Sequence, residues 1–138
     1  MIDKSSFDAL KSQHNFIHHL PEKLQELISD GLEPESNIQY ICPISVNGKS
    51  GCLVMLDNKM TAYWISKLLF MKFPTMQEFN YSQVNQMNAL DGNKLYLHCS
   101  ADPQKQQEDY EEGEFGFQTE SERTVVAQII KSGAVRLK

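Results

Sequence analysis

The histidines near the N-terminus are the residues whose type and spacing come nearest to a metal site. His14 and His18 are four residues apart, so a helix would place them on one face. A zinc site needs three or four ligands, and no cysteine or acidic residue lies at a matching spacing. We therefore predict no metal site, and we expect His14, His18 and the adjacent His19 to form a partly exposed polar helix face.

A second pair of residues with reactive side chains is His98 beside Cys99, which could suggest a thiolate paired with a histidine. Neighbours on a strand point to opposite faces, so these two side chains are not expected to touch. Cys42, Cys52 and Cys99 are an odd number without a CxxC pair, which predicts reduced, mostly buried thiols in a cytoplasmic protein. A Cys42–Cys52 bridge across a hairpin is the alternative left open.

The other common catalytic signatures are missing from the sequence. It contains no G-x-S-x-G nucleophile elbow, no G-x-x-x-x-G-K-[ST] loop and no G-x-G-x-x-G that opens a helix. The acidic run over residues 108–114 lacks the alternating oxygen spacing of a calcium loop. We predict that the chain is not an enzyme, and we predict no cofactor.

Length and charge narrow the class of partner. The chain has 138 residues, with 13 basic and 18 acidic side chains and a formal net charge of −5. This length suits one domain with its own core, and the acidic balance argues against a nucleic-acid-coating protein. The first residues lack the apolar core of a signal peptide, and no apolar run approaches the ~18 residues that span a bilayer. We expect a cytoplasmic protein that binds no nucleic acid.

The spacing of apolar residues changes along the chain. Residues 5–30 have helical spacing interrupted at Pro21, which predicts two short helices. Alternating segments separated by turn signals, of which Asn47-Gly48 is one, then predict seven strands. Pro43 removes a ladder donor and places the first strand at an edge or at a bulge. The expected strands cover residues 37–46, 51–57, 59–66, 75–81, 84–90, 94–100 and 114–118, and 101–112 is expected to be a long polar loop.

The C-terminal segment has the clearest helix signal. Thr119 and Glu122 fit a capping box, valines and isoleucines follow at helical spacing, and Gly133 is expected to end the helix. Two short helices, seven antiparallel strands and one amphipathic helix predict an α+β fold. Because short strands hide their edges by curling, we expect a barrel or two packed sheets, with the C-terminal helix plugging an open end.

Four stretches of the sequence are similar to motifs of a known family. Leu-Glu-Pro-Glu at 32–35 is similar to an L-x-x-G-E lead-in, and 51–64 to a G-x-L-V-L-T-D-K-R-L-Y hairpin, with Met60 in place of a basic residue. Residues 78–84 are similar to x-F-x-Y-x-x-I, and 113–133 match a closing strand and helix. The chain resembles the pleckstrin-homology-like (PH-like) family, particularly its small bacterial relatives. The resemblance implies a seven-stranded antiparallel PH-like barrel or sandwich over 32–138, with 1–31 as a helical appendage.

Apolar residues in unexpected places indicate a contact surface. Residues 53–56 and 62–65 are apolar on both strand faces, so we expect the N-terminal helices, or another copy, to cover the outer face. Residues 67–74 are expected to be an unusually apolar loop that needs a cover: the same chain, a partner protein or a membrane interface. The candidate interface residues are Leu68, Leu69, Phe70, Met71 and the aromatic anchor Trp64.

Lysines near the expected turns are candidates for contact with lipid or another anion. The PH-like resemblance implies such residues around the first hairpin and the next loop. The candidates are Lys49, Lys59, Lys67 and Lys72. No arginine occurs before Arg123, so a pocket for bidentate phosphate contacts looks depleted.

These observations favour a non-catalytic binding or scaffold domain that acts through protein contact. The PH-like resemblance implies a tendency to self-assemble, so homo-oligomerisation is the leading hypothesis. The alternatives are weak peripheral membrane or lipid-headgroup binding, and a small inhibitory, immunity-type protein that uses the acidic run over 108–114 against a basic partner.

Overall fold

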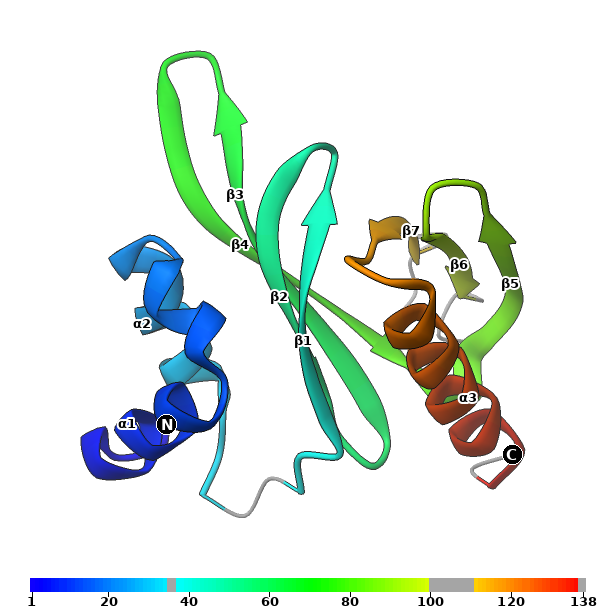
Figure 1. Cartoon of the computed structure of the whole chain (residues 1–138), viewed down its shortest axis with the longest axis horizontal. Coiled ribbons are helices and arrows are strands. Elements are labelled where there is room, and N and C mark those ends of the chain that lie inside the picture. The colour runs from blue at the N-terminus through cyan, green and yellow to red at the C-terminus, as the bar shows by residue number, and fades with distance from the viewer. Residues whose placement is uncertain (35–36, 100–110, 137–138) are drawn as a thin grey trace, which may run out of the picture.

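The computed structural model describes residues 1–34, 37–99 and 111–136. Three helical segments precede seven strands, and a long helix closes the chain (Figure 1). In chain order the elements are α1 (Lys4–Gln13), the 3₁₀ helix η1 (Asn15–His19), α2 (Glu22–Gly31), β1 (Tyr40–Val46), β2 (Lys49–Met55), β3 (Lys59–Leu68), β4 (Met71–Asn80), the 3₁₀ helix η2 (Tyr81–Gln83), β5 (Val84–Leu90), β6 (Lys94–Cys99), β7 (Glu111–Gly116) and α3 (Glu120–Arg136).

The seven strands form one antiparallel sheet in the order β4-β3-β2-β1-β7-β6-β5, so the predicted α+β class and strand number are confirmed. The sheet is open, with β4 and β5 at its edges. Strand β1 pairs with β2 along its whole length but meets β7 only at Ser45 and Gly116. Pro43 therefore lies in a strand that is central in order but joined to β7 at a single position. This weak junction divides the sheet into two halves, β1–β4 and β5–β7 (Figure 1).

The inner core fills the space between the two halves. Phe79 from β4 and Phe115 from β7 pack edge to face, with ring centroids 5.5 Å apart. Helix α3 adds Val126 and Ile130, both almost wholly buried in the same cluster. The helix begins at the predicted cap, where the Glu122 N–H donates to Thr119 Oγ1 at 3.1 Å. Burial of these side chains makes α3 the cover of the inner core.

Gly133 does not end α3, which continues to Arg136, so that expectation is wrong. A Cβ at this position would clash with the ring of Tyr81. The Tyr81 hydroxyl in turn donates to the Leu56 carbonyl at 2.8 Å. The glycine is thus explained by close packing of the helix on Tyr81, not by termination.

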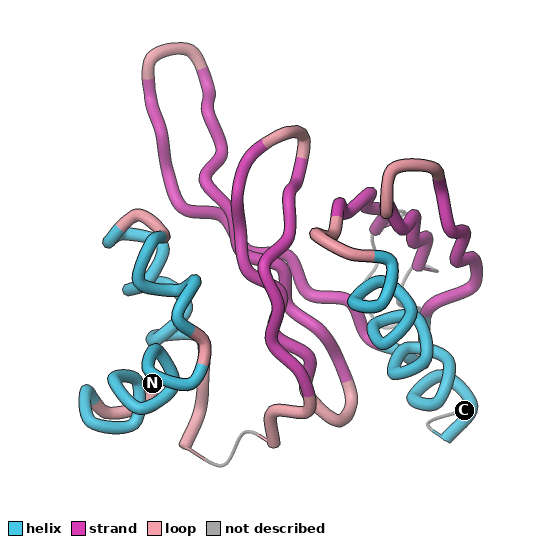
Figure 2. The backbone as a smooth tube through the Cα atoms, viewed as in Figure 1, coloured by secondary structure: helices cyan, strands magenta, loops and turns pink. Residues whose placement is uncertain are grey.

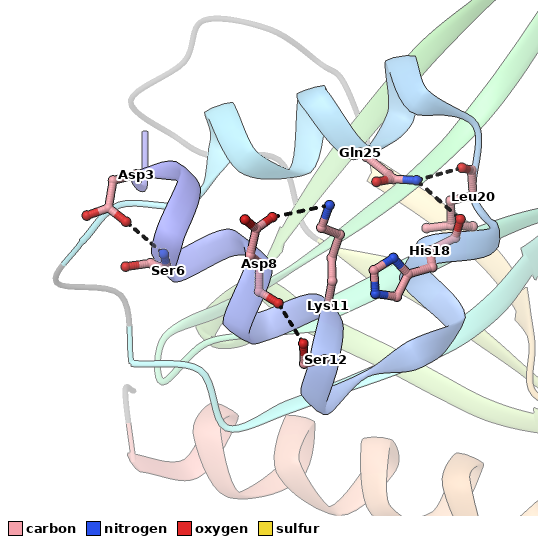
Figure 3. A network of polar contacts seen from close by, with 8 residues as sticks. All are labelled: Asp3, Ser6, Asp8, Lys11, Ser12, His18, Leu20 and Gln25. Carbon is pink, nitrogen blue, oxygen red and sulfur yellow. Dashed lines mark hydrogen bonds and ion pairs between the residues drawn. The ribbon is translucent and has the colours of Figure 1, made fainter.

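The N-terminal helices cover the outer face of the first half. Ile17, Leu24 and Ile28 are fully buried and share one apolar cluster with Cys52 and Val54 of β2. The layer is held by local polar contacts (Figure 3): Asp3 caps α1 by accepting from the Ser6 N–H at 2.7 Å, and the Gln25 side chain donates to the Leu20 carbonyl at 2.9 Å. Side chains on both faces of β2 are therefore buried, as the sequence pattern indicates.

Candidate functional site: the β3–β4 hairpin tip

Residues 67–74 are not a loop but the paired ends of two strands, so the loop prediction is wrong. The register of β3 and β4 continues through Lys67 opposite Lys72 to Leu68 opposite Met71. Only Leu69 and Phe70 remain for the turn. The hairpin extends beyond the neighbouring β1–β2 hairpin (Figure 2). Its apolar end, Leu68, Leu69, Phe70 and Met71, is called the hairpin tip below.

The hairpin tip is uncovered. Leu69 and Phe70 are 83% and 100% exposed, and Leu68 and Met71 are more than half exposed. Of the three covers considered from the sequence, burial within the same chain is thus not supported by the described residues. The N-terminal helices cover Tyr63 and Ile65 on the outer face of β3, below the tip. The tip is available to a partner.

The turn has an unfavourable residue at its first position. Leu69 has φ 56, in the left-handed region. A side chain with a Cβ costs about 1–2 kcal/mol in this region, which glycine and asparagine enter more easily. Backbone strain of this kind concentrates at functional sites, and Leu69 adds apolar surface that the turn itself does not need. The residue types at the tip are therefore not explained by hairpin stability.

Two lysines lie directly behind the tip. Lys67 and Lys72 are opposite each other across the strands, a placement in which like charges repel. Residues 61–77, which form most of the hairpin, contain these two lysines and no acidic residue, although the chain as a whole carries −5. The distal hairpin is thus locally basic.

The other two candidate lysines lie outside the hairpin tip. Lys49 begins β2 beside the Asn47-Gly48 turn of the neighbouring hairpin. Lys59 begins β3, eight residues before Lys67, or roughly 26 Å at the usual strand rise. Its ammonium lies 3.0 Å from Glu78 Oε1. Lys59 therefore does not share an anion site with Lys67 and Lys72.

Trp64 is separate from the tip. It is half-buried on the inner face of β3, where it packs against the inner core. It also lines a hollow of about 290 Å³ with Tyr96, Glu112 and Glu114. The Tyr96 hydroxyl donates to Glu112 at 2.8 Å, and Lys94 lies 3.5 Å from Glu114. Of the five candidate interface residues, the structure thus brings four together and leaves Trp64 as a packing residue.

The histidine and cysteine side chains singled out from the sequence lie in positions that do not favour catalysis. His98 Nδ1 lies 2.7 Å from the Asn85 amide oxygen, whereas Cys99 is buried in the inner core on the opposite face. Burial raises the pKa of the Cys42 thiol to about 12, with a smaller contribution from Glu122, and it raises the pKa of Cys52 further. Cys42 faces the inner core and Cys52 the outer cluster, so a bridge between them is not formed.

No group of three metal-ligating side chains occurs among the described residues, His14, His18 and His19 included. The sequence did not reveal a hollow of about 410 Å³ between η1 and strands β1 and β2. Its titratable lining residue is His19, which alone provides no acid–base pair. Within the same described ranges, no helix has both the length and the apolar character to cross a membrane.

The fold has counterparts among solved structures. The DH/PH domains of p115-RhoGEF match with a TM-score of 0.57 and 11% identity over 87% of this chain and 36% of theirs. The linker-DH/PH domains of the same protein match at 0.56 and 13%, over 88% and 36%. The DH/PH domains of PDZ-RhoGEF, solved in complex with activated RhoA, match at 0.54 and 8%, over 86% and 35%.

The chain therefore spans about a third of the length of each of these structures. No family model matches the sequence, and no curated protein matches it. At these identities the likeness concerns the fold alone, and it agrees with the strand order and the C-terminal helix described above. The chain has a pleckstrin-homology-like fold.

Proposed function

We propose that this chain is a non-catalytic binding module and that the hairpin tip is its contact element. The observation that supports this proposal is the complete exposure of Phe70 within four consecutive apolar residues. Exposed apolar surface of this kind is typical of interaction sites in folded proteins. Two further observations favour binding over catalysis. Burial raises the pKa of the Cys42 thiol, and His19 is the titratable residue that lines the hollow of about 410 Å³.

The appendage belongs to this module in the same proposal. Residues 1–31 and the domain over 32–138 act as one unit, because the helices and strands share an apolar cluster. All three cysteines are buried and none is in a disulfide, which supports a cytoplasmic location, where thiols stay reduced.

A second copy of the chain is an alternative partner, through self-association of the hairpin tips. Its contact area is a weakness, because a standard interface uses about 20–30 residues on each side and the tip offers four. Two tips in contact would also bring two pairs of like-charged lysines together. Self-association through this surface alone is therefore less favoured than contact with a different partner.

The immunity-type alternative depends on the acidic run over 108–114, of which 108–110 lie outside the described residues. Within the rest, Glu112 and Glu114 already contact Tyr96 and Lys94. Nothing in these contacts favours a basic partner enzyme over the exposed tip.

The proposal can be tested without knowing the partner. A photoreactive benzoylphenylalanine in place of Phe70 is expected to form discrete adducts, with protein or lipid, in the cells that make the chain. The same residue in place of Val135, which is 79% exposed on α3, serves as the matched control. Equal labelling from both positions, or none from position 70, would contradict the proposal. Native mass measurement of wild type and Phe70→Asp tests self-association, which predicts a loss of oligomer in the variant.

A further inference from the structure

We infer that the partner of the hairpin tip is the surface of an anionic lipid bilayer. The tip inserts among the lipids while Lys67 and Lys72 contact the phosphate-bearing headgroups. This inference rests on the proposed function, because it names the partner of the same contact element.

The spacing of the two residue types fits the depth of an interface. Leu68 and Met71 are one strand step beyond the lysine pair, and Leu69 and Phe70 are one step further. Two steps at the usual strand rise give about 7 Å. Apolar groups of interfacial proteins insert about 5–10 Å into the boundary between headgroups and acyl chains. The tip can therefore reach the apolar region while the ammonium groups stay at headgroup level.

Charge complementarity favours an anionic surface. The two ammonium groups repel each other in the free protein, and negative charge placed beside both of them relieves this repulsion. No carboxylate of the hairpin between residues 61 and 77 opposes the approach. The lysine ammonium is also a flexible point charge, which suits a fluid array of headgroups better than one fixed ligand.

The shape of the contact element also favours a bilayer over a folded protein. The tip is a narrow end of two strands and a two-residue turn, and it projects beyond the β1–β2 hairpin (Figure 2). A protein partner would need a matching pocket and further contacts around it to form a stable interface. A bilayer needs neither, since it deforms around the inserted side chains.

Recognition depends on charge and apolar insertion, not on one headgroup structure. Lys59 is paired with Glu78 at the far end of β3 and is not available at the tip. The hollow beside Trp64 is lined by Glu112 and Glu114, which oppose a phosphate group. We therefore expect vesicles with different anionic lipids of equal charge to bind equally.

Co-sedimentation with vesicles tests the inference. Wild type is expected to sediment with vesicles of phosphatidylcholine mixed with phosphatidylglycerol, less with phosphatidylcholine alone, and less as salt is raised. Lys67→Gln combined with Lys72→Gln is expected to weaken binding about 25-fold, since each lysine contributes about fivefold. Phe70→Ser is expected to weaken it by at least about tenfold. The matched controls are Lys4→Gln with Lys131→Gln, and Val135→Ser, all exposed and on other elements.

The depth of insertion has its own measurement. Trp64 is the only tryptophan of the chain, so Phe70→Trp adds one reporter at the tip. Its emission is expected to shift to the blue with the mixed vesicles and to be quenched by brominated acyl chains. Val135→Trp is expected to show neither effect.

The outcomes separate this inference from the proposed function. Vesicle binding that is lost in the tip variants and kept in the controls supports both. No vesicle binding, together with protein adducts from position 70 alone, would overturn the bilayer and leave the contact element in place. No vesicle binding and no adducts specific to position 70 would reject both. Binding that the control variants weaken as much as the tip variants would also overturn the inference.

Discussion

The two long hairpins of the first half-sheet differ at their turns. The β1–β2 turn has Asn47 at φ 52 and Gly48 at φ 77, residue types that enter the left-handed region easily and are typical of two-residue hairpins. The β3–β4 turn has Leu69 at φ 56, followed by Phe70. Backbone conformation explains the sequence of the β1–β2 turn. The β3–β4 turn costs conformational energy and exposes two large apolar side chains.

The stability of the fold therefore explains the residue types in the first turn but not those in the second. In the bodies of both hairpins, most apolar residues are buried by the inner core or by the N-terminal helices, whereas Phe73 and Met76 of β4 are 39% and 38% exposed. At the β3–β4 tip the same residue types are exposed, and two lysines lie behind them. The hairpins therefore have a common structural role at their bases, and we attribute a binding role to the tip of the second.

The largest expected effect compares a buried and an exposed residue. Leu53 in β2 is fully buried, so Leu53→Ala is expected to lower the free energy of unfolding by about 2–5 kcal/mol. Phe70→Ala is expected to change it by less than about 0.5 kcal/mol, since the ring has no neighbours to lose. Urea denaturation of both variants checks this. A large loss of stability in Phe70→Ala would mean that the hairpin tip packs on the protein and is not free to bind a partner.

The next effect concerns Tyr63 in the body of β3, under the N-terminal helices. Burial raises the pKa of Tyr63 from its ordinary value of 10.0 to about 12. The folded protein holds the proton of this phenol more tightly than the unfolded chain does. The stability that the protonated phenol contributes is therefore fully present below pH 10 and is lost as the pH rises towards 12. The loss amounts to about 3 kcal/mol.

Tyr63→Phe is expected to reduce this loss of stability at alkaline pH. Urea denaturation at a series of pH values from about 8 to about 12 measures it. The substitution is not expected to abolish the loss, because the buried thiols of Cys42 and Cys52 shift in the same direction. Identical pH profiles for wild type and variant would show that the helices do not bury the phenol.

A smaller effect is expected at the β1–β2 turn. Gly48→Ala meets no neighbouring atoms, so only the backbone conformation is affected. We expect a loss of about 1 kcal/mol in the free energy of unfolding, with no change in vesicle binding. Weakened binding at unchanged stability would assign the contact to the first hairpin instead.

The smallest effect is expected at Lys59. Its ion pair with Glu78 is partly exposed, so Lys59→Gln is expected to change stability by less than about 1 kcal/mol. Because it lies at the base of β3, vesicle binding should equal that of wild type, in contrast to the Lys67 and Lys72 pair. Equal losses from Lys59→Gln and Lys67→Gln in co-sedimentation would contradict a site confined to the tip.

Local signals predicted much of this fold. The Thr119 cap and the Asn47-Gly48 turn are recognised from a few adjacent residues, and both are present. The segment over 67–74 was predicted wrongly because its apolar run lacks alternation, and its pairing is imposed by the register that begins at Lys59 and Asn80. Gly133 was predicted wrongly because its reason is contact with Tyr81, distant in the sequence.

The candidate site was predictable in type but not in arrangement. The four apolar residues of the tip are adjacent in the sequence, so their grouping needed no structure. The separation of Trp64 from them, and of Lys59 from Lys67, depends on how far each lies along β3 and which face it occupies. Both separations depend on how the strands pair, and residue types and short spacings in the sequence do not determine that pairing.

Leu69→Asn separates the backbone conformation of the β3–β4 turn from the contact that the hairpin tip makes. Asparagine tolerates the left-handed conformation of Leu69 and removes the apolar side chain, so one substitution affects folding and contact in opposite directions. We predict a free energy of unfolding equal to or above that of wild type, together with clearly weakened sedimentation with anionic vesicles. Sedimentation equal to that of wild type, in a variant that is folded and no less stable, would show that the hairpin tip does not bind the bilayer.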